Sequence, residues 1–139
     1  MKLLVSACLL GHNCKYNGGN NDNAKVHRFL ADKDYIIFCP ESASGLPCPR
    51  NPAEIQGEAV IDRSGKDVTE YFHRGAQMAL ELCQKHGIDT ALLKESSPSC
   101  GSHLIYDGTF SKKKLPGLGI TARLLAAHGI RLLSEEDLD

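Results

Sequence analysis

Three short apolar runs, separated by segments with helical periodicity, limit the folds open to this chain more than any other feature. The runs cover residues 2–7, 35–38 and 90–93, and each has the length of a buried β-strand. Strands that alternate with helices form a mostly parallel sheet with helices on both faces. The sequence therefore predicts an α/β fold, a three-layer α/β/α sandwich around a Rossmann-like sheet.

Three helices are predicted from apolar residues that recur every three or four positions. The longest begins after Asp67, where Glu70 completes a capping-box pattern, and ends near His86, before Gly87. Its inward stripe comprises Val68, Phe72, Ala76, Ala79 and Cys83. The other expected elements are helices at 24–31 and 120–128 and a last strand at 130–133.

Long connections follow the second and third runs. A proline-rich stretch at 40–55 precedes a turn or small hairpin around Ser64-Gly65. A further hairpin is predicted at 105–110, with its turn at Asp107-Gly108. Because loops this long are uncommon in small proteins unless they serve a function, we expect the site to lie among these connections.

Length and charge restrict the partners. Residues 1–139 are expected to form a single domain that buries roughly two-thirds of the surface of its unfolded chain. The net charge of −1 provides no field that gathers long nucleic acids, so a small ligand is expected. No tract is long enough to span a membrane, and the apolar start is interpreted as a buried strand rather than a signal peptide. We therefore expect a cytoplasmic protein without a membrane partner.

Three of the six cysteines follow the predicted strands. Cys8, Cys39 and Cys100 each lie at or soon after a strand end, in a segment marked by glycine or proline. The carboxyl ends of parallel strands share one edge of the sheet, where ligands bind. Cytosolic thiols stay reduced, so disulfides are not expected. Three converging sulfurs favour a metal ion or an iron–sulfur cluster over three separately buried thiols.

The other three cysteines receive different interpretations. Cys83 lies on the inward stripe of the long helix and is expected to pack in the core. Cys14 and Cys48 lie in the loops, where each is either a fourth ligand or a bystander. No CxxC pair is present, so the spacing does not indicate a zinc finger.

Two polar residues next to the cysteines are candidates for catalysis. Glu41 lies two positions after Cys39, so on an extended backbone its carboxylate points the same way as the sulfur and can act as a general acid or base. Ser97 precedes Cys100 and can bind a substrate oxygen or deliver a proton. The plainer alternatives are a solvated loop glutamate and a serine that bonds to the backbone of a turn.

Other polar residues near the third strand end leave alternatives open. Lys94 and Glu95 can face the crevice, although an exposed ion pair is the simpler interpretation. His103 lies close to Cys100 in the sequence and can pair with its thiol, which keeps a cofactor-free cysteine–histidine enzyme open.

Taken together, these motifs resemble those of the DUF523 proteins, the thiouracil desulfurase-like family. The matching segments are 6–11, 14–18, 39–41, 45–46, 49–50, 52–55, 94, 97–101 and 119–122. They run from the first strand to the last helix and so cover essentially the whole chain. This chain departs from the family pattern at Ser42-Ala43-Ser44, where a glycine pair is common, and at Cys48, where a non-ligating residue is usual.

The resemblance implies a cofactor and a reaction. A [4Fe–4S] cluster would be held by Cys8, Cys39 and Cys100, which leaves one iron open to take the thiocarbonyl sulfur, while Glu41 and Ser97 would assist catalysis. The expected substrate is a thiolated pyrimidine base or nucleotide (2-thiouracil, 4-thiouracil or a thiouridine monophosphate), which would yield the uracil product and sulfide without net redox change.

A non-enzymatic role is the main alternative. In that case the protein would be a binding module in which the cluster, or a zinc ion, has a sensing or structural role. Four protein ligands and no exchangeable position on the metal would favour this alternative.

Overall fold

A four-stranded parallel sheet forms the centre of the protein in a computed structural model, which describes residues 2–138. The strand order is β2-β1-β5-β8, and all three pairings are parallel. The strands are β1 (Lys2–Ser6), β2 (Asp34–Phe38), β5 (Thr90–Leu93) and β8 (Arg131–Ser134). The α/β fold with a mostly parallel sheet is thereby confirmed.

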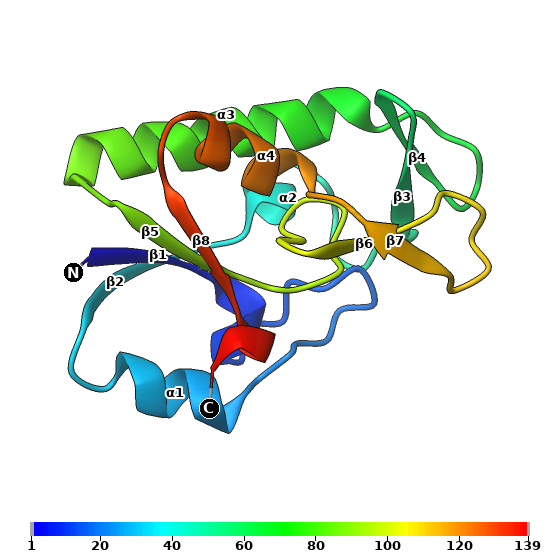
Figure 1. Ribbon diagram of the computed structural model, residues 1–139. Coiled ribbons are helices and arrows are strands. Elements are labelled where there is room, and N and C mark those ends of the chain that lie inside the picture. The colour runs from blue at the N-terminus through cyan, green and yellow to red at the C-terminus, as the bar shows by residue number, and fades with distance from the viewer. Residues whose placement is uncertain (1, 139) are drawn as a thin grey trace.

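Helices cover both faces of this sheet (Figure 1). They are α1 (Ala24–Leu30), α3 (Thr69–His86) and α4 (Ile120–Ala127). Successive residues of a strand point to opposite faces, so β1 serves two cores. Leu4 packs in a cluster with residues of α3 and α4, whereas Leu3 and Val5 pack with residues of α1. Among the helices of residues 2–138, none combines the length and the apolar character needed to cross a membrane.

The long helix α3 matches its predicted end but not its predicted cap. Gly87, at φ 66°, ends the helix in the left-handed conformation, and the predicted inward stripe is buried. The capping box of Asp67 and Glu70 does not form. Instead, the Asp67 carboxylate accepts hydrogen bonds from the backbone N–H (2.9 Å) and the hydroxyl of Thr69. The helix therefore begins with a local aspartate turn.

A glycine in α3 brings the segment after Cys39 close to the helix. That segment forms one helical turn, α2 (Pro40–Ala43). A Cβ atom at Gly75 would lie 2.3 Å from the carbonyl oxygen of Pro40, far inside van der Waals contact. Gly75 therefore permits the close approach of α2 to α3, which fixes the position of the chain next to Cys39.

Two antiparallel hairpins lie beside the sheet, and only part of this arrangement was predicted. The first pairs β3 (Ala53–Gln56) with β4 (Ala59–Asp62), so the proline-rich stretch already contains a strand. The second pairs β6 (Leu104–Tyr106) with β7 (Lys114–Pro116), not with residues 109–110 as predicted.

The predicted turn at Asp107-Gly108 instead begins a longer loop at 107–113. The buried Glu54 carboxylate accepts hydrogen bonds from the backbone N–H groups of Gly108 (2.9 Å) and Phe110 (3.2 Å). These donors are therefore unavailable to a strand ladder. This long-range carboxylate is the physical reason why the local turn signal was misleading.

Candidate active site

The carboxyl ends of β1, β2 and β5 border a cavity of about 460 Å³. The sheet order places β2 on one side of β1 and β5 on the other, so the chain reverses its direction of growth across the sheet at β1. In open α/β sheets, ligands bind in the crevice at such a switch point. The loops after the three strands all contribute to the cavity lining.

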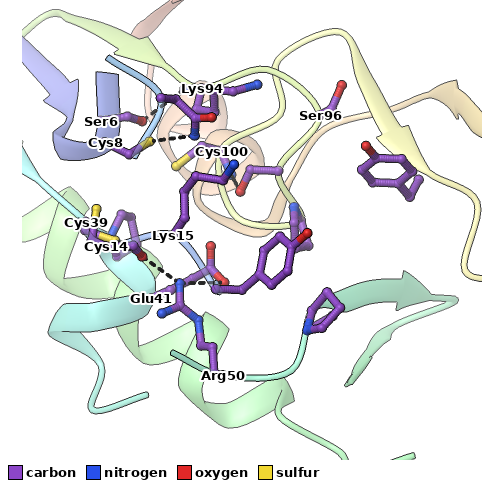
Figure 2. A pocket seen from close by; sticks show the side chains of 18 of the residues that line it. Ser6, Cys8, Cys14, Lys15, Cys39, Glu41, Arg50, Lys94, Ser96 and Cys100 are labelled. Carbon is purple, nitrogen blue, oxygen red and sulfur yellow. Dashed lines mark hydrogen bonds and ion pairs between the residues drawn. The ribbon is translucent and has the colours of Figure 1, made fainter. Parts of the chain in front are cut away.

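Four cysteines line this cavity, three of them from the segments that follow β1, β2 and β5 (Figure 2). Cys8 lies in the short turn after β1, Cys39 immediately follows β2, and Cys100 lies in the loop after β5. Cys14, from the long loop before α1, is the fourth. All of them are free thiols. The structure thus brings Cys8, Cys39 and Cys100 to one cavity at the sheet edge, as the sequence predicts.

The remaining two cysteines lie elsewhere. Cys83 is buried in α3, as expected for a core residue. Cys48 is exposed, and its thiol donates hydrogen bonds to the backbone carbonyls of Asn13 and Lys15, each at 3.2 Å. Its side chain does not line the cavity.

Hydrogen bonds among the cavity thiols lower the pKa of some and raise the pKa of another. The Cys14 thiol lowers the pKa of Cys39 to about 5 and also lowers the pKa of Cys8. The same hydrogen bonds raise the pKa of Cys14, while burial raises the pKa of Cys100 to about 12. Thiolates are the metal-binding form of cysteine, so the pKa shifts of Cys39 and Cys8 favour ligation, whereas that of Cys100 does not.

Within residues 2–138, no three histidine, cysteine or acidic side chains are grouped as the ligands of one metal ion would be. The cavity thiols are nevertheless the type of ligand that iron–sulfur clusters use. In addition, the Asn21 side-chain amide donates to the Cys8 sulfur at 3.3 Å, the type of hydrogen bond that tunes iron–sulfur clusters. The donor set therefore fits an iron–sulfur cluster.

Glu41 lies in the cavity beside these thiols and is held by Arg50. A guanidinium nitrogen of Arg50 lies 3.5 Å from a carboxylate oxygen of Glu41, and the Arg50 side chain is only 7% exposed. Burial raises the pKa of Glu41 to about 7, although the charge of Arg50 opposes this rise. A carboxyl group with such a pKa can both accept and donate a proton near neutrality.

Ser97 lines the cavity and also shapes the turn that carries Cys100. Its hydroxyl oxygen accepts hydrogen bonds from the backbone N–H groups of Ser99 and Cys100, both at 3.1 Å. Gly119 closes this turn from the other side, since a Cβ atom there would lie 2.5 Å from the Ser99 carbonyl. The position of Cys100 is therefore fixed by the start of α4 as well as by its own loop.

The buried Glu95 carboxylate organises the remainder of the same loop. One of its oxygens accepts hydrogen bonds from four backbone N–H groups at 2.9–3.2 Å, those of Ser96, Ser102, His103 and Leu104. The other oxygen bonds to the His103 ring and the Ser102 hydroxyl. Burial alone would raise the pKa of Glu95, but the hydrogen bonds from Leu104 and His103 lower it to about 2.

This network corrects two interpretations from the sequence. Glu95 is only 2% exposed and pairs with His103, so it does not form an exposed ion pair with Lys94. Lys94 instead pairs with Glu135 at 3.0 Å. Because His103 is turned toward Glu95 and does not line the cavity, the structure gives no support to a Cys100–His103 nucleophile.

Replacing Glu95 with glutamine is expected to lower the free energy of unfolding at pH 7 by about 2 kcal/mol, since hydrogen bonds to a buried charge are lost. The pKa of the Glu95 carboxyl group is about 2 in the folded protein and 4.5 in the unfolded chain. The stabilisation is therefore present above pH 4.5 and is lost as the pH falls toward 2. Urea unfolding across this pH range tests the prediction, with the exposed Glu81→Gln as the control. A pH-independent difference between wild type and Glu95→Gln would contradict it.

The outer part of the cavity is formed by residues of the loop after β4 and of the loop between β6 and β7. Phe110 and Lys112, from the loop anchored by Glu54, line it together with Arg63. Phe110 and Lys112 have positive φ angles of 56° and 65°, a backbone conformation that is unfavourable for residues other than glycine. Such backbone strain is often found at functional sites.

Comparison with known proteins identifies the family. A family model described as 2-thiouracil desulfurase matches residues 3–137, nearly the whole chain. The chain belongs to the 2-thiouracil desulfurase family. The resemblance stated from the sequence motifs is therefore confirmed.

Two known proteins are similar to this chain over nearly their full lengths. A solved structure described as the [4Fe–4S]-dependent thiouracil desulfidase TudS (DUF523) has 50% sequence identity and a TM-score of 0.92, covering 97% of this chain and 91% of that one. YbbK of Bacillus subtilis (strain 168), a protein described as uncharacterized, is 41% identical over 147 residues, covering 99% of this chain and 97% of that protein.

Proposed function

We propose that this protein is a [4Fe–4S]-dependent desulfidase that converts a thiolated uracil derivative and water into the uracil product and sulfide. The observation that carries the proposal is the meeting of Cys8, Cys39 and Cys100 in one cavity at the switch point of the sheet. The family match and the likeness to a thiouracil desulfidase of this cofactor type support the same reaction.

Cys8, Cys39 and Cys100 are the proposed cluster ligands. Each follows a different strand, and all three line one cavity at the carboxyl edge of the sheet. When bound through three cysteines, the cluster supplies a Lewis-acidic iron without a protein ligand. We assign Cys14 to hydrogen bonding with the neighbouring thiolates rather than to ligation, which agrees with the opposite pKa shifts of Cys14 and Cys39.

Glu41 and Ser97 are the proposed catalytic side chains. Glu41 takes a proton from the attacking water and returns it later, a role for which its raised pKa and its place beside the thiols are suited. Ser97 orients the substrate through its hydroxyl group. Since its oxygen already accepts from two backbone N–H groups, the hydroxyl proton is available to donate into the cavity.

The proposed substrate is a thiolated pyrimidine, as the base or as its nucleotide. Glu41 and the thiols line the inner part of the cavity, where the pyrimidine ring would bind. The exposed cations Arg63 and Lys112 line its outer wall, where they can bind the phosphate of a nucleotide. We place the reaction in the cytoplasm, where six free thiols stay reduced.

A sensor or structural module is less well supported by the site. Such a role requires closed ligation, whereas the three strand-end thiols face a cavity with room for a small molecule. The buried Glu41–Arg50 pair in the same cavity has no evident use in a purely structural site.

Sulfide release by the reconstituted protein tests the proposal. After anaerobic reconstitution to about four irons per chain, the protein is incubated with 2-thiouracil, 4-thiouracil and the corresponding thiouridine monophosphates. We expect sulfide and the matching uracil product in equal amounts from at least one of them, without added reductant. An intact cluster with no sulfide from any of the four compounds would refute the proposed activity.

A further inference from the structure

The loop between β1 and α1 carries a lysine into the centre of the cavity. Lys15 lines the cavity, and its side chain extends into the space framed by Cys8, Cys100 and Glu41 (Figure 2). The residue is half-buried. A cation in this position is partly removed from water, which is unfavourable unless an anion compensates for it.

Lys15 differs in this respect from the other cations of the cavity. Arg50 is paired with Glu41, and Lys94 is paired with Glu135. Arg63 and Lys112 are exposed to solvent at the outer wall. Within residues 2–138, no side chain forms an ion pair with Lys15, and no group accepts a hydrogen bond from its ammonium. The natural partner of Lys15 is therefore a group that enters the cavity.

The backbone that carries Lys15 is held in place from the opposite loop. The Cys48 thiol donates to the carbonyl oxygen of Lys15, and the Arg50 side chain donates to that of Cys14 at 3.0 Å. The backbone N–H of Arg50 donates to the carbonyl oxygen of Tyr16. Three consecutive carbonyl groups are thus fixed, so the lysine projects from a preorganised loop rather than from a free one.

We propose that Lys15 is a catalytic residue of the desulfidase reaction, whose ammonium faces the thiocarbonyl end of the substrate and neutralises the charge of the departing sulfur. This inference rests on the proposed function. The water oxygen forms a bond to the thiocarbonyl carbon, and the carbon–sulfur bond breaks. Its electron pair leaves with the sulfur as hydrogensulfide, and the second proton is released, so nothing is oxidised or reduced. A cation beside the leaving sulfur stabilises the transition state more than the neutral substrate.

Lys15→Met and Lys15→Arg separate this role from a structural one. We expect Lys15→Met to lower kcat for 2-thiouracil by about 100-fold, as for other removed charge-stabilising donors, with KM changed much less. Iron content and the visible absorption of the loaded protein should equal those of wild type. Lys15→Arg keeps the charge and should recover most of the lost kcat. Lys113→Met, in the exposed part of the 107–113 loop and outside the cavity lining, is the matched control.

Two results would overturn the assignment of Lys15. A kcat for Lys15→Met within threefold of wild type would show that the ammonium does not act on the reaction. Loss of iron from Lys15→Met after reconstitution would show that the lysine balances the cluster rather than the leaving sulfur. Failure of the proposed function itself is distinguished by the wild type, which would then release no sulfide from any thiolated probe despite a full iron content.

Discussion

Replacing Cys8 with alanine is expected to abolish cluster binding and, with it, sulfide release. The three proposed ligands follow three separate strands, and the fourth cavity thiol, Cys14, is assigned to hydrogen bonding rather than to ligation. After anaerobic reconstitution and desalting, the iron content of Cys8→Ala should fall to near background, and the visible absorption should disappear. Because a ligand that binds only the folded state stabilises it, wild type should also gain thermal stability on reconstitution, while Cys8→Ala should not.

Two further cysteine variants make this prediction specific. Cys83→Ala removes a thiol that is buried in α3 and does not line the cavity, and it should retain the full iron content. Cys14→Ser keeps a hydrogen-bond donor beside the cavity thiols and should also bind the cluster. If Cys14→Ser instead lost its iron while Cys8→Ala kept it, the ligand set would have to be reassigned to Cys14, Cys39 and Cys100.

The position of the site was predictable because it follows from strand order. The apolar runs ending before Cys8 and Cys39 could be recognised as strands, and parallel strands bring their carboxyl ends to one edge. Local patterns also placed α1, α3 and α4 to within a few residues. Such predictions depend only on neighbours along the chain, which the sequence shows directly.

The contacts that complete the site depend on residues far apart in the chain and could not be predicted in this way. Glu54 overrides the turn signal of Asp107-Gly108 by bonding to backbone groups more than 50 positions away. Glu95 has the appearance of a surface glutamate, yet the folded loop surrounds it with N–H donors. Arg50 stands within a recognisable motif, but its pairing with Glu41 depends on how the proline-rich stretch turns back. Charge and hydrophobicity alone do not reveal which polar residues the fold will bury.

Replacing Glu41 with glutamine is expected to lower kcat by about 100- to 10,000-fold, the range associated with loss of a general acid or base. Glutamine has nearly the same shape and can still accept a hydrogen bond from Arg50, but it cannot exchange a proton. Iron content should remain that of wild type. Single-turnover sulfide release with 2-thiouracil measures the effect, and Glu58→Gln, in the exposed turn between β3 and β4, is the control.

Glutamine is more informative here than alanine because of Arg50. Alanine at position 41 would leave a guanidinium group that is only 7% exposed without its carboxylate, and the resulting strain on the 47–50 loop would reach the thiols through Cys14. A loss of activity in Glu41→Ala could then reflect a displaced loop. With Glu41→Gln the loop keeps its contacts, so a full loss of activity with an intact cluster assigns proton transfer to Glu41. Activity within tenfold of wild type would instead require that another group in the cavity, or water itself, move the proton.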